Sequence, residues 1–254
     1  MNGTLLHPLL PGLWTTELAL PDFHVRGAVL VGAERAVVWD TLSRPADLAP
    51  VLPLLQGREV VAVYSHADWD HAWGTAGLPG PAAVVAHRVA AERLLSEAPG
   101  ELEEKRKEDP DRYRDVVLIL PTLTFEEEHH LDLGGLSLEL HALPGHTADC
   151  IVALIPERGV LLAGDTVETP LPLLNPGSDL DGWTRRLEGW AEDPRVELVV
   201  PAHGELGGTD LLRRTARYLR GLREPDDTPE PSGLDDFYRR AHRRNRELAR
   251  AATS

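Results

Sequence analysis

The chain has 254 residues, of which 42% are hydrophobic, and this is enough for one large domain with a substantial core. A formal net charge of −15 disfavours a general nucleic-acid binder, and a single cysteine excludes an intramolecular disulfide. The apolar runs are too short to span a membrane, and no cationic segment precedes the first apolar residues. We therefore expect a cytoplasmic protein that binds neither nucleic acids nor membranes.

The first half of the chain is predicted to begin with short strands. Runs rich in β-branched residues between turn residues indicate strands at 12–20, 25–32, 35–41 and 58–66. The last of these, "REVVAVYSH", is mostly apolar, as is typical of a strand that is buried on both faces. Helical apolar spacing predicts a helix over 43–55 behind a serine cap, and a charged helical region over 87–115 with a break at Pro99-Gly100.

The second half again alternates strands and helices. Strands are predicted within 122–146, 150–167 and 196–204, and helices over 179–193 and 209–223. Such alternation favours stacked α/β layers. A polar, proline-rich linker follows, and an Arg-rich helix begins near Leu234. We expect one domain over 1–224, with the linker and the C-terminal helix over 225–254.

Side chains that can bind a metal ion follow four successive apolar strands, where a loop can present them at the edge of a sheet. These residues are His66, Asp68, Asp70 and His71 after the first strand, then His146, Asp165 and His203. Imidazole suits zinc and iron, and a carboxylate can bridge two ions. Seven such ligands exceed what one tetrahedral ion needs, so the pattern indicates a centre with two metal ions.

Four segments in this order resemble the metallo-β-lactamase superfamily of metallohydrolases. They are "SHADWDH", "PGHTAD", "LLAGDT" and "VVPAHGE", and the resemblance covers about residues 12–205. It implies an α/β fold, the four-layer αββα sandwich in which two mixed sheets lie face to face with helices outside. The C-terminal helix would then be a short extension of this fold.

The resemblance also implies a role for each ligand. His66, Asp68 and His146 would hold the first ion, Asp70, His71 and His203 the second, and Asp165 would bridge both. The first motif of the family is His-x-His-x-Asp-His, so Asp68 stands where the family has its second histidine. A carboxylate at this position makes iron or manganese an alternative to zinc, which is the first choice. Asp68 could instead be an ordinary surface residue.

We expect a hydrolase in which a metal-bridging hydroxide attacks a small ester, lactone, thioester or phosphodiester. Asp70 and Asp165 would be the catalytic carboxylates, with Asp70 moving the proton. A non-haem iron oxidoreductase and a non-catalytic metal-binding protein are the alternatives. Arg213, Arg217 or Tyr238 could contribute to specificity, while the substrate and the oligomeric state stay open. His87 matches no ligand motif and is expected to cap a helix or line a pocket.

Overall fold

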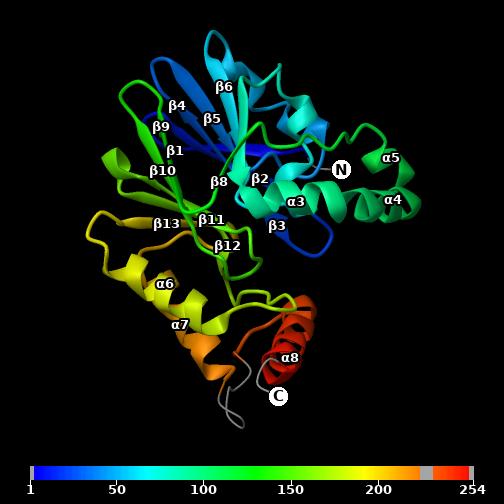
Figure 1. Ribbon diagram of the computed structural model, residues 1–254, viewed down its shortest axis with the longest axis vertical. Helices are drawn as coiled ribbons and strands as arrows, with labels where there is room; N and C mark the ends of the chain where they lie inside the picture. Colours follow the sequence, from blue (N-terminus) through cyan, green and yellow to red (C-terminus); the bar gives the residue numbers. More distant parts are fainter. Residues whose placement is uncertain (1–2, 224–230, 252–254) are drawn as a thin grey trace. The chain divides into compact units, whose positions relative to one another are not determined.

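The computed structural model describes residues 3–223 and 231–251 (Figure 1). The chain forms two compact units, Met1–Ala142 and Leu143–Ser254. Of the linker expected to begin at residue 225, the part up to residue 230 lies outside the described residues. The division into a domain over 1–224 and an extension over 225–254 stays a prediction.

An eight-stranded sheet forms the centre of the first unit, drawn in blue to green in Figure 1. Its order is β1-β2-β4-β5-β6-β7-β8, and β3 pairs with β2. Neighbours from β1 to β5 are antiparallel, whereas β5, β6, β7 and β8 are parallel. The strands are β1 Leu5–Leu10, β2 Leu13–Ala19, β3 His24–Val25, β4 Ala28–Val31, β5 Arg35–Trp39, β6 Glu59–Val63, β7 Ala83–His87 and β8 Leu123–Phe125.

The parallel strands set the position of the first ligand motif. In register, Trp39 at the end of β5 lies opposite Val63 at the end of β6. The carboxyl ends of parallel strands meet at the same edge of a sheet, so the residues that follow β5 and β6 are neighbours there. Asp40 and the segment Ser65–His71 are therefore brought together by strand pairing.

The helices of the first unit are shorter than the sequence suggests. They are α1 Leu52–Leu55, α2 Trp69–Ala72, α3 Arg88–Ser96, α4 Ala98–Glu108 and α5 Pro110–Tyr113, with a 3₁₀ turn at Pro45–Leu48. The continuous helix predicted over 43–55 is wrong, because its prolines restrict the chain to a 3₁₀ turn and one short helix. The predicted break at Pro99-Gly100 falls at Glu97 instead, since Pro99 lies in the first turn of α4, where its missing N–H is harmless.

A β-hairpin closes the first unit. Its strands, β9 Glu128–Asp132 and β10 Ser137–Ala142, are antiparallel. Gly134 and Gly135 form the turn between them with positive φ angles of 79° and 83°, a conformation that glycine adopts without steric cost. His129 and His130 lie on β9, where His130 is exposed.

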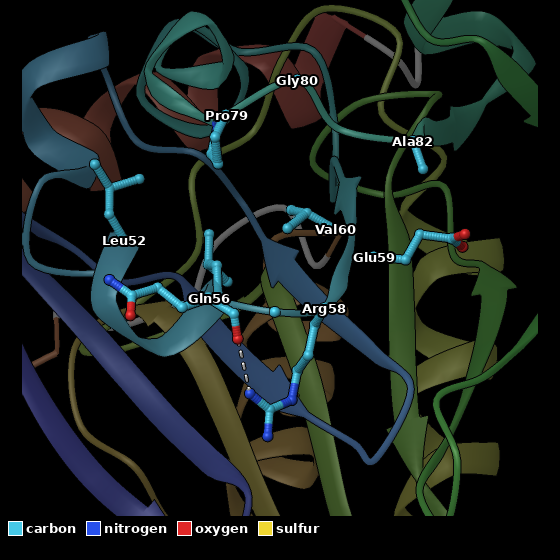
Figure 2. A pocket seen from close by; sticks show the side chains of 10 residues that line it. Leu52, Gln56, Arg58, Glu59, Val60, Pro79, Gly80 and Ala82 are labelled. Carbon is cyan, nitrogen blue, oxygen red and sulfur yellow. Dashed lines mark hydrogen bonds between the residues drawn. The ribbon is translucent and has the colours of Figure 1, made fainter.

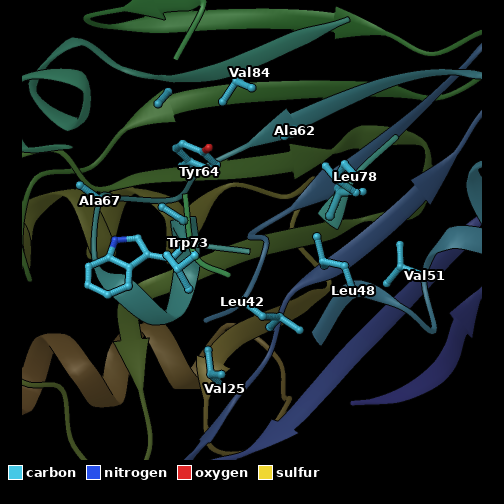
Figure 3. Packing of buried hydrophobic residues seen from close by; sticks show 14 of the residues in the cluster. Val25, Leu42, Leu48, Val51, Ala62, Tyr64, Ala67, Trp73, Leu78 and Val84 are labelled. Carbon is cyan, nitrogen blue, oxygen red and sulfur yellow. The ribbon is translucent and has the colours of Figure 1, made fainter. Parts of the chain in front are cut away.

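The core of the first unit includes Ala67 and Trp73, which lie within and just after the first ligand motif (Figure 3). Trp73 is fully buried and packs among the apolar side chains of this cluster, as does Tyr64. The hydroxyl of Tyr64 lies 2.7 Å from Thr75 Oγ1 and donates to the carbonyl of Ile119 at 3.0 Å. The loop that carries the ligands is thus anchored at both ends in a packed core.

Among its described residues, the second unit has three further strands, three α-helices and a 3₁₀ turn at Pro156–Arg158. The strands are β11 Ile151–Ile155, β12 Val160–Glu168 and β13 Leu198–His203; the helices are α6 Leu180–Glu192, α7 Asp210–Gly221 and α8 Asp236–Ala251. β12 lies between the other two strands, antiparallel to β11 and parallel to β13. A buried core around Trp183 and Leu187 joins α6 and α7 to these strands. None of the helices in the described part of the chain has both the length and the apolar character needed to cross a membrane.

Gly74, at the end of the first ligand motif, is expected to be intolerant of a side chain. A Cβ at this position would lie 1.8 Å from the carbonyl oxygen of Thr41 and 2.9 Å from that of Arg44. Gly74→Ala must displace backbone, and we expect it to lower the free energy of unfolding by about 3 kcal/mol.

Gly100→Ala is the matched control, because nothing lies within 4 Å of a Cβ built at this position. It should stabilise α4 by about 0.5–1 kcal/mol. Denaturant titrations measure both, and equal effects would contradict this account.

Candidate metal centre

The first ligand motif joins the end of β6 to the start of α2. Asp68 precedes α2 and has an extended backbone, with φ −64° and ψ 152°, whereas Asp70 and His71 lie in the helix itself. His66 and His71 are fully buried and Asp70 is 5% exposed. Two residues of the motif thus come from an extended segment and two from a helical turn, which directs their side chains differently.

A buried carboxylate, Asp40, orients both histidines of this motif. It accepts hydrogen bonds from the Nδ1–H of His71 (2.9 Å), from the Ser65 hydroxyl (2.9 Å) and from the Ser65 backbone N–H (2.7 Å). Because the only hydrogen of the Ser65 hydroxyl goes to Asp40, its oxygen accepts from the Nδ1–H of His66 at 2.9 Å. Both imidazoles therefore carry their hydrogen on Nδ1 and their lone pair on Nε2, as metal-binding histidines commonly do.

Asp40 was not among the residues selected from the sequence. The signal was present, because Asp40 follows the apolar strand Val37-Val38-Trp39 in the same way that the other candidates follow their strands. Its backbone adopts a positive φ of 57°, which aspartate tolerates better than most residues.

The distances between donor atoms within this motif suit a bound metal ion. His66 Nε2 lies 3.4 Å from Asp68 Oδ2, and His71 Nε2 lies 3.7 Å from Asp70 Oδ1. Two ligands on one tetrahedral ion, with bonds of about 2.1 Å, are about 3.4 Å apart. Each of these two pairs therefore has about the spacing of two ligands on one divalent ion.

Asp68 has a second partner that sequence reasoning missed. It occupies the N-cap position of α2, where an aspartate usually accepts a backbone N–H, but it makes no such bond. Its Oδ1 instead accepts from Arg93 Nη2 of α3 at 2.7 Å, while Oδ2 faces His66. The carboxylate thus joins an arginine to a candidate ligand, which argues against an ordinary surface residue.

In the second unit, Asp165 lies between two histidines. Its Oδ2 is 3.8 Å from His146 Nε2, and its Oδ1 is 3.3 Å from His203 Nε2. Asp165 lies within β12, and His203 ends the neighbouring parallel strand β13. All three side chains are nearly buried. A carboxylate that turns each oxygen toward a different imidazole has the geometry of a bridging ligand.

The C-terminal helix fixes His146 from a distance. The Nδ1–H of His146 donates to the carbonyl of Leu173 at 2.8 Å. Asn245 of α8, which is 1% exposed, holds the residues on both sides of Leu173. Its Oδ1 accepts from Leu174 N at 2.9 Å, and its Nδ2 donates to Pro172 O at 2.7 Å. The orientation of His146 therefore depends on a side chain from α8.

Two of the three residues suggested for specificity have structural partners. The Tyr238 hydroxyl donates to Glu168 Oε1 at 2.9 Å, and burial raises the pKa of the Glu168 carboxyl to about 7. Arg213 donates to the carbonyl of Ala191 at the end of α6. Arg217 is exposed. All three lie in the same unit as Asp165, and Tyr238 is hydrogen-bonded to Glu168 at the end of β12.

Two side chains beside the first motif lie on α4. Lys105 Nζ is 3.8 Å from the centre of the Trp69 ring, a cation–π contact. Burial, and after it the charge of Asp68, raises the pKa of Glu101 to about 7. His87 has the capping role expected for it, because its Nδ1 accepts from Val89 N at the start of α3.

A cleft of about 400 Å³ in the first unit lies away from these residues. Figure 2 shows that Leu52, Gln56, Val60 and Pro79 are among the residues that line it. Val60 belongs to the beginning of β6, whereas the ligand motif follows the end of that strand. None of the seven candidate ligands lines this cleft.

The family model described as the metallo-beta-lactamase superfamily matches residues 23–203. "Metallo-beta-lactamase type 2" of Bacteroides fragilis is 28% identical over 47% of this chain and 50% of its own length. "Acyl-coenzyme A thioesterase MBLAC2" of Homo sapiens is 29% identical over 73% of this chain and 75% of its own length. The chain thus spans about half the length of the bacterial relative.

The solved structure of a metallo-beta-lactamase from Pontibacter korlensis matches with a TM-score of 0.65 and 22% identity. It covers 85% of this chain, and the match includes 99% of that structure. The fold class expected from the sequence is thereby confirmed. The chain is a mixed α/β protein whose sheets and helices match those of solved metallo-β-lactamases.

Proposed function

We propose that this chain, which belongs to the metallo-β-lactamase superfamily, is a hydrolase with two divalent metal ions that cleaves a small acyl thioester or ester. The family match confirms the resemblance seen in its four motifs and makes the chain a hydrolase of this superfamily. The number of ions, their identity and the substrate belong to the proposal, as does the cytoplasmic location expected from the single cysteine.

The observation that carries the proposal is the arrangement of the candidate ligands within each unit. In the second unit, Asp165 faces His146 and His203. In the first unit, His66 and His71 each face a carboxylate of the same motif. His66, Asp68 and His146 would hold the first ion, and Asp70, His71 and His203 the second. Asp165 would bridge them, because its two oxygens face different imidazoles. This mixed nitrogen and oxygen donor set suits zinc, and Asp68 makes iron or manganese the alternative.

When bound, the two ions would acidify a water molecule and polarise the carbonyl oxygen of the substrate. The residues of the chain supply the rest. Asp70 would accept the proton of the attacking water, since its carboxylate lies beside His71 at the second site. Asp40 would hold the hydrogen of His71 on Nδ1 and so keep Nε2 available as a ligand.

The choice of a thioester is supported by the human relative, which is named an acyl-coenzyme A thioesterase and matches across three quarters of its own length. The metallo-beta-lactamases among the relatives make a cyclic amide the second candidate. Both substrates have an electrophilic carbonyl carbon and require the same attack by water. The proposed mechanism therefore applies to either substrate, and a substrate panel can show which of the two the protein prefers.

We expect protein purified without chelator to contain close to two zinc ions per chain and to hydrolyse a short acyl thioester. A panel of acyl thioesters, aryl esters, lactones, a phosphodiester and a chromogenic cephalosporin measures the preference, and elemental analysis measures the metal. Chelation should abolish turnover, and zinc should restore it. Absence of transition metal together with no uptake of zinc, iron or manganese would overturn the proposal. Preferential cleavage of the cephalosporin would replace the thioester as substrate.

A further inference from the structure

Asp68 brings a negative charge to a position where the family motif has a neutral imidazole. The change leaves three carboxylates, Asp68, Asp70 and Asp165, among the seven candidate ligands. A third carboxylate would strengthen the binding of any divalent cation and weaken the selectivity for zinc. The structure places a compensating charge beside it, because Arg93 Nη2 is 2.7 Å from Asp68 Oδ1.

We propose that Arg93 balances the charge of Asp68, so that the two residues together replace the neutral histidine of the first metal site. This inference rests on the proposed function. Arg93 would not touch the ion, since it contacts the oxygen of Asp68 that faces away from His66. It is a positioning residue that also reduces the negative potential at the first site.

The setting of the pair makes this interaction stronger than an exposed ion pair. The side chains of Arg93 and Asp68 are 22% and 26% exposed, so water screens the pair only in part. Arg93 also contacts Glu97 at 3.0 Å, but the Glu97 side chain is 62% exposed and more strongly screened. Two side chains of α4, Glu101 and Lys105, add charges nearby. Burial, and after it the charge of Asp68, raises the pKa of the Glu101 carboxyl, and Lys105 and Arg93 act on that pKa in the opposite direction.

The charges determine the sign of the effect on metal binding. Removal of Arg93 while Asp68 stays leaves an uncompensated carboxylate, which should attract a dication more strongly. Replacement of Asp68 by histidine while Arg93 stays leaves the cation with only the exposed Glu97 as partner, so the first site becomes more positive and should repel a dication. Replacement of both residues, Asp68 by histidine and Arg93 by methionine, should give a neutral donor without the charge of Arg93 beside it. The two substitutions are therefore expected to be strongly non-additive.

The test is a double-mutant cycle in the full-length protein with R93M, D68H and the double variant D68H/R93M. Competition with a chromophoric chelator measures the dissociation constant for zinc, and circular dichroism checks that each variant is folded. R93M keeps the aliphatic stem and should bind zinc about tenfold more tightly. D68H should bind about tenfold more weakly, and D68H/R93M should return to within about threefold of the wild type. R93K, which keeps the charge, should stay close to the wild type.

E97Q is the matched control, because it removes the other carboxylate on Arg93 and leaves Asp68 untouched. It should leave zinc affinity unchanged. Weaker zinc binding by R93M, or additive effects in the cycle, would show that Arg93 only anchors a side chain and would overturn the inference. A wild-type protein that binds no zinc, iron or manganese would overturn the proposed function as well, so the two failures are distinguishable.

Discussion

Asp165→Ala is expected to strip both metal ions from the protein and to lower hydrolytic activity at least about a thousandfold. The reason is geometric. The two oxygens of Asp165 face His146 and His203, so one substitution removes a shared ligand rather than a ligand of one ion. Elemental analysis after gel filtration measures the metal content, and a steady-state assay on the preferred thioester measures the activity.

His87→Ala provides the control for this experiment. His87 is also a histidine at a strand end, but its Nδ1 caps α3 and its Nε2 lies 3.0 Å from the carbonyl of Glu126. Its replacement should cost about 1 kcal/mol of stability through the lost cap and leave the metal content unchanged. If His87→Ala lost metal while Asp165→Ala kept both ions, the assignment of ligands would be wrong.

Asp40→Ala should weaken metal binding by about 10–100-fold although Asp40 is not a proposed ligand. Its carboxylate accepts one hydrogen bond from His71 and two from Ser65, one from the hydroxyl and one from the backbone N–H. The Ser65 hydroxyl is also hydrogen-bonded to His66. Loss of these bonds releases both imidazoles of the first motif and leaves buried donors without their acceptor. We expect a loss of about 3 kcal/mol in the free energy of unfolding as well.

Asp47→Ala separates the two effects of Asp40→Ala. Asp47 is a buried carboxylate of the same unit that accepts from Ser43 and Arg44 and contacts no candidate ligand. It should lower stability without changing the affinity for zinc. Chelator competition measures the zinc affinity of both variants, and urea titration measures their stability. If zinc affinity fell equally in both variants, Asp40 would contribute only to stability and not to the orientation of the ligands.

The sequence was sufficient to find the candidate ligands because each one follows an apolar strand, and that pattern is local. The residues that hold the ligands were missed because their partners are distant in sequence. Asp40 and His71 are 31 residues apart, Arg93 and Asp68 are 25 apart, and Asn245 and Leu174 are 71 apart. Such contacts depend on strand register and helix docking, which no short window of sequence contains.

Helix boundaries show the same division between local and distant causes. The turns at Gly134-Gly135 and Gly159 were predictable, since each needs the positive φ that glycine allows. The region 43–55 was predicted as one helix from its apolar spacing, but Leu48, Val51 and Leu55 reach the core from separate short turns. One continuous helix or two short turns could bury the same apolar residues. The prolines favour the two short turns.

The clamp formed by Asn245 sets an order of events during synthesis. His66 leaves the ribosome roughly 180 residues before Asn245, which at about 5–20 residues per second is a delay of roughly 10–40 seconds. During this interval the first motif can already fold on its sheet, while the carbonyl of Leu173 that orients His146 still lacks its clamp. A nascent chain would thus have the four donors of the first motif in place before His146 reached its final orientation. Metal captured early would be held without His146 in its final orientation, and the complete set of ligands would form only after α8 had docked.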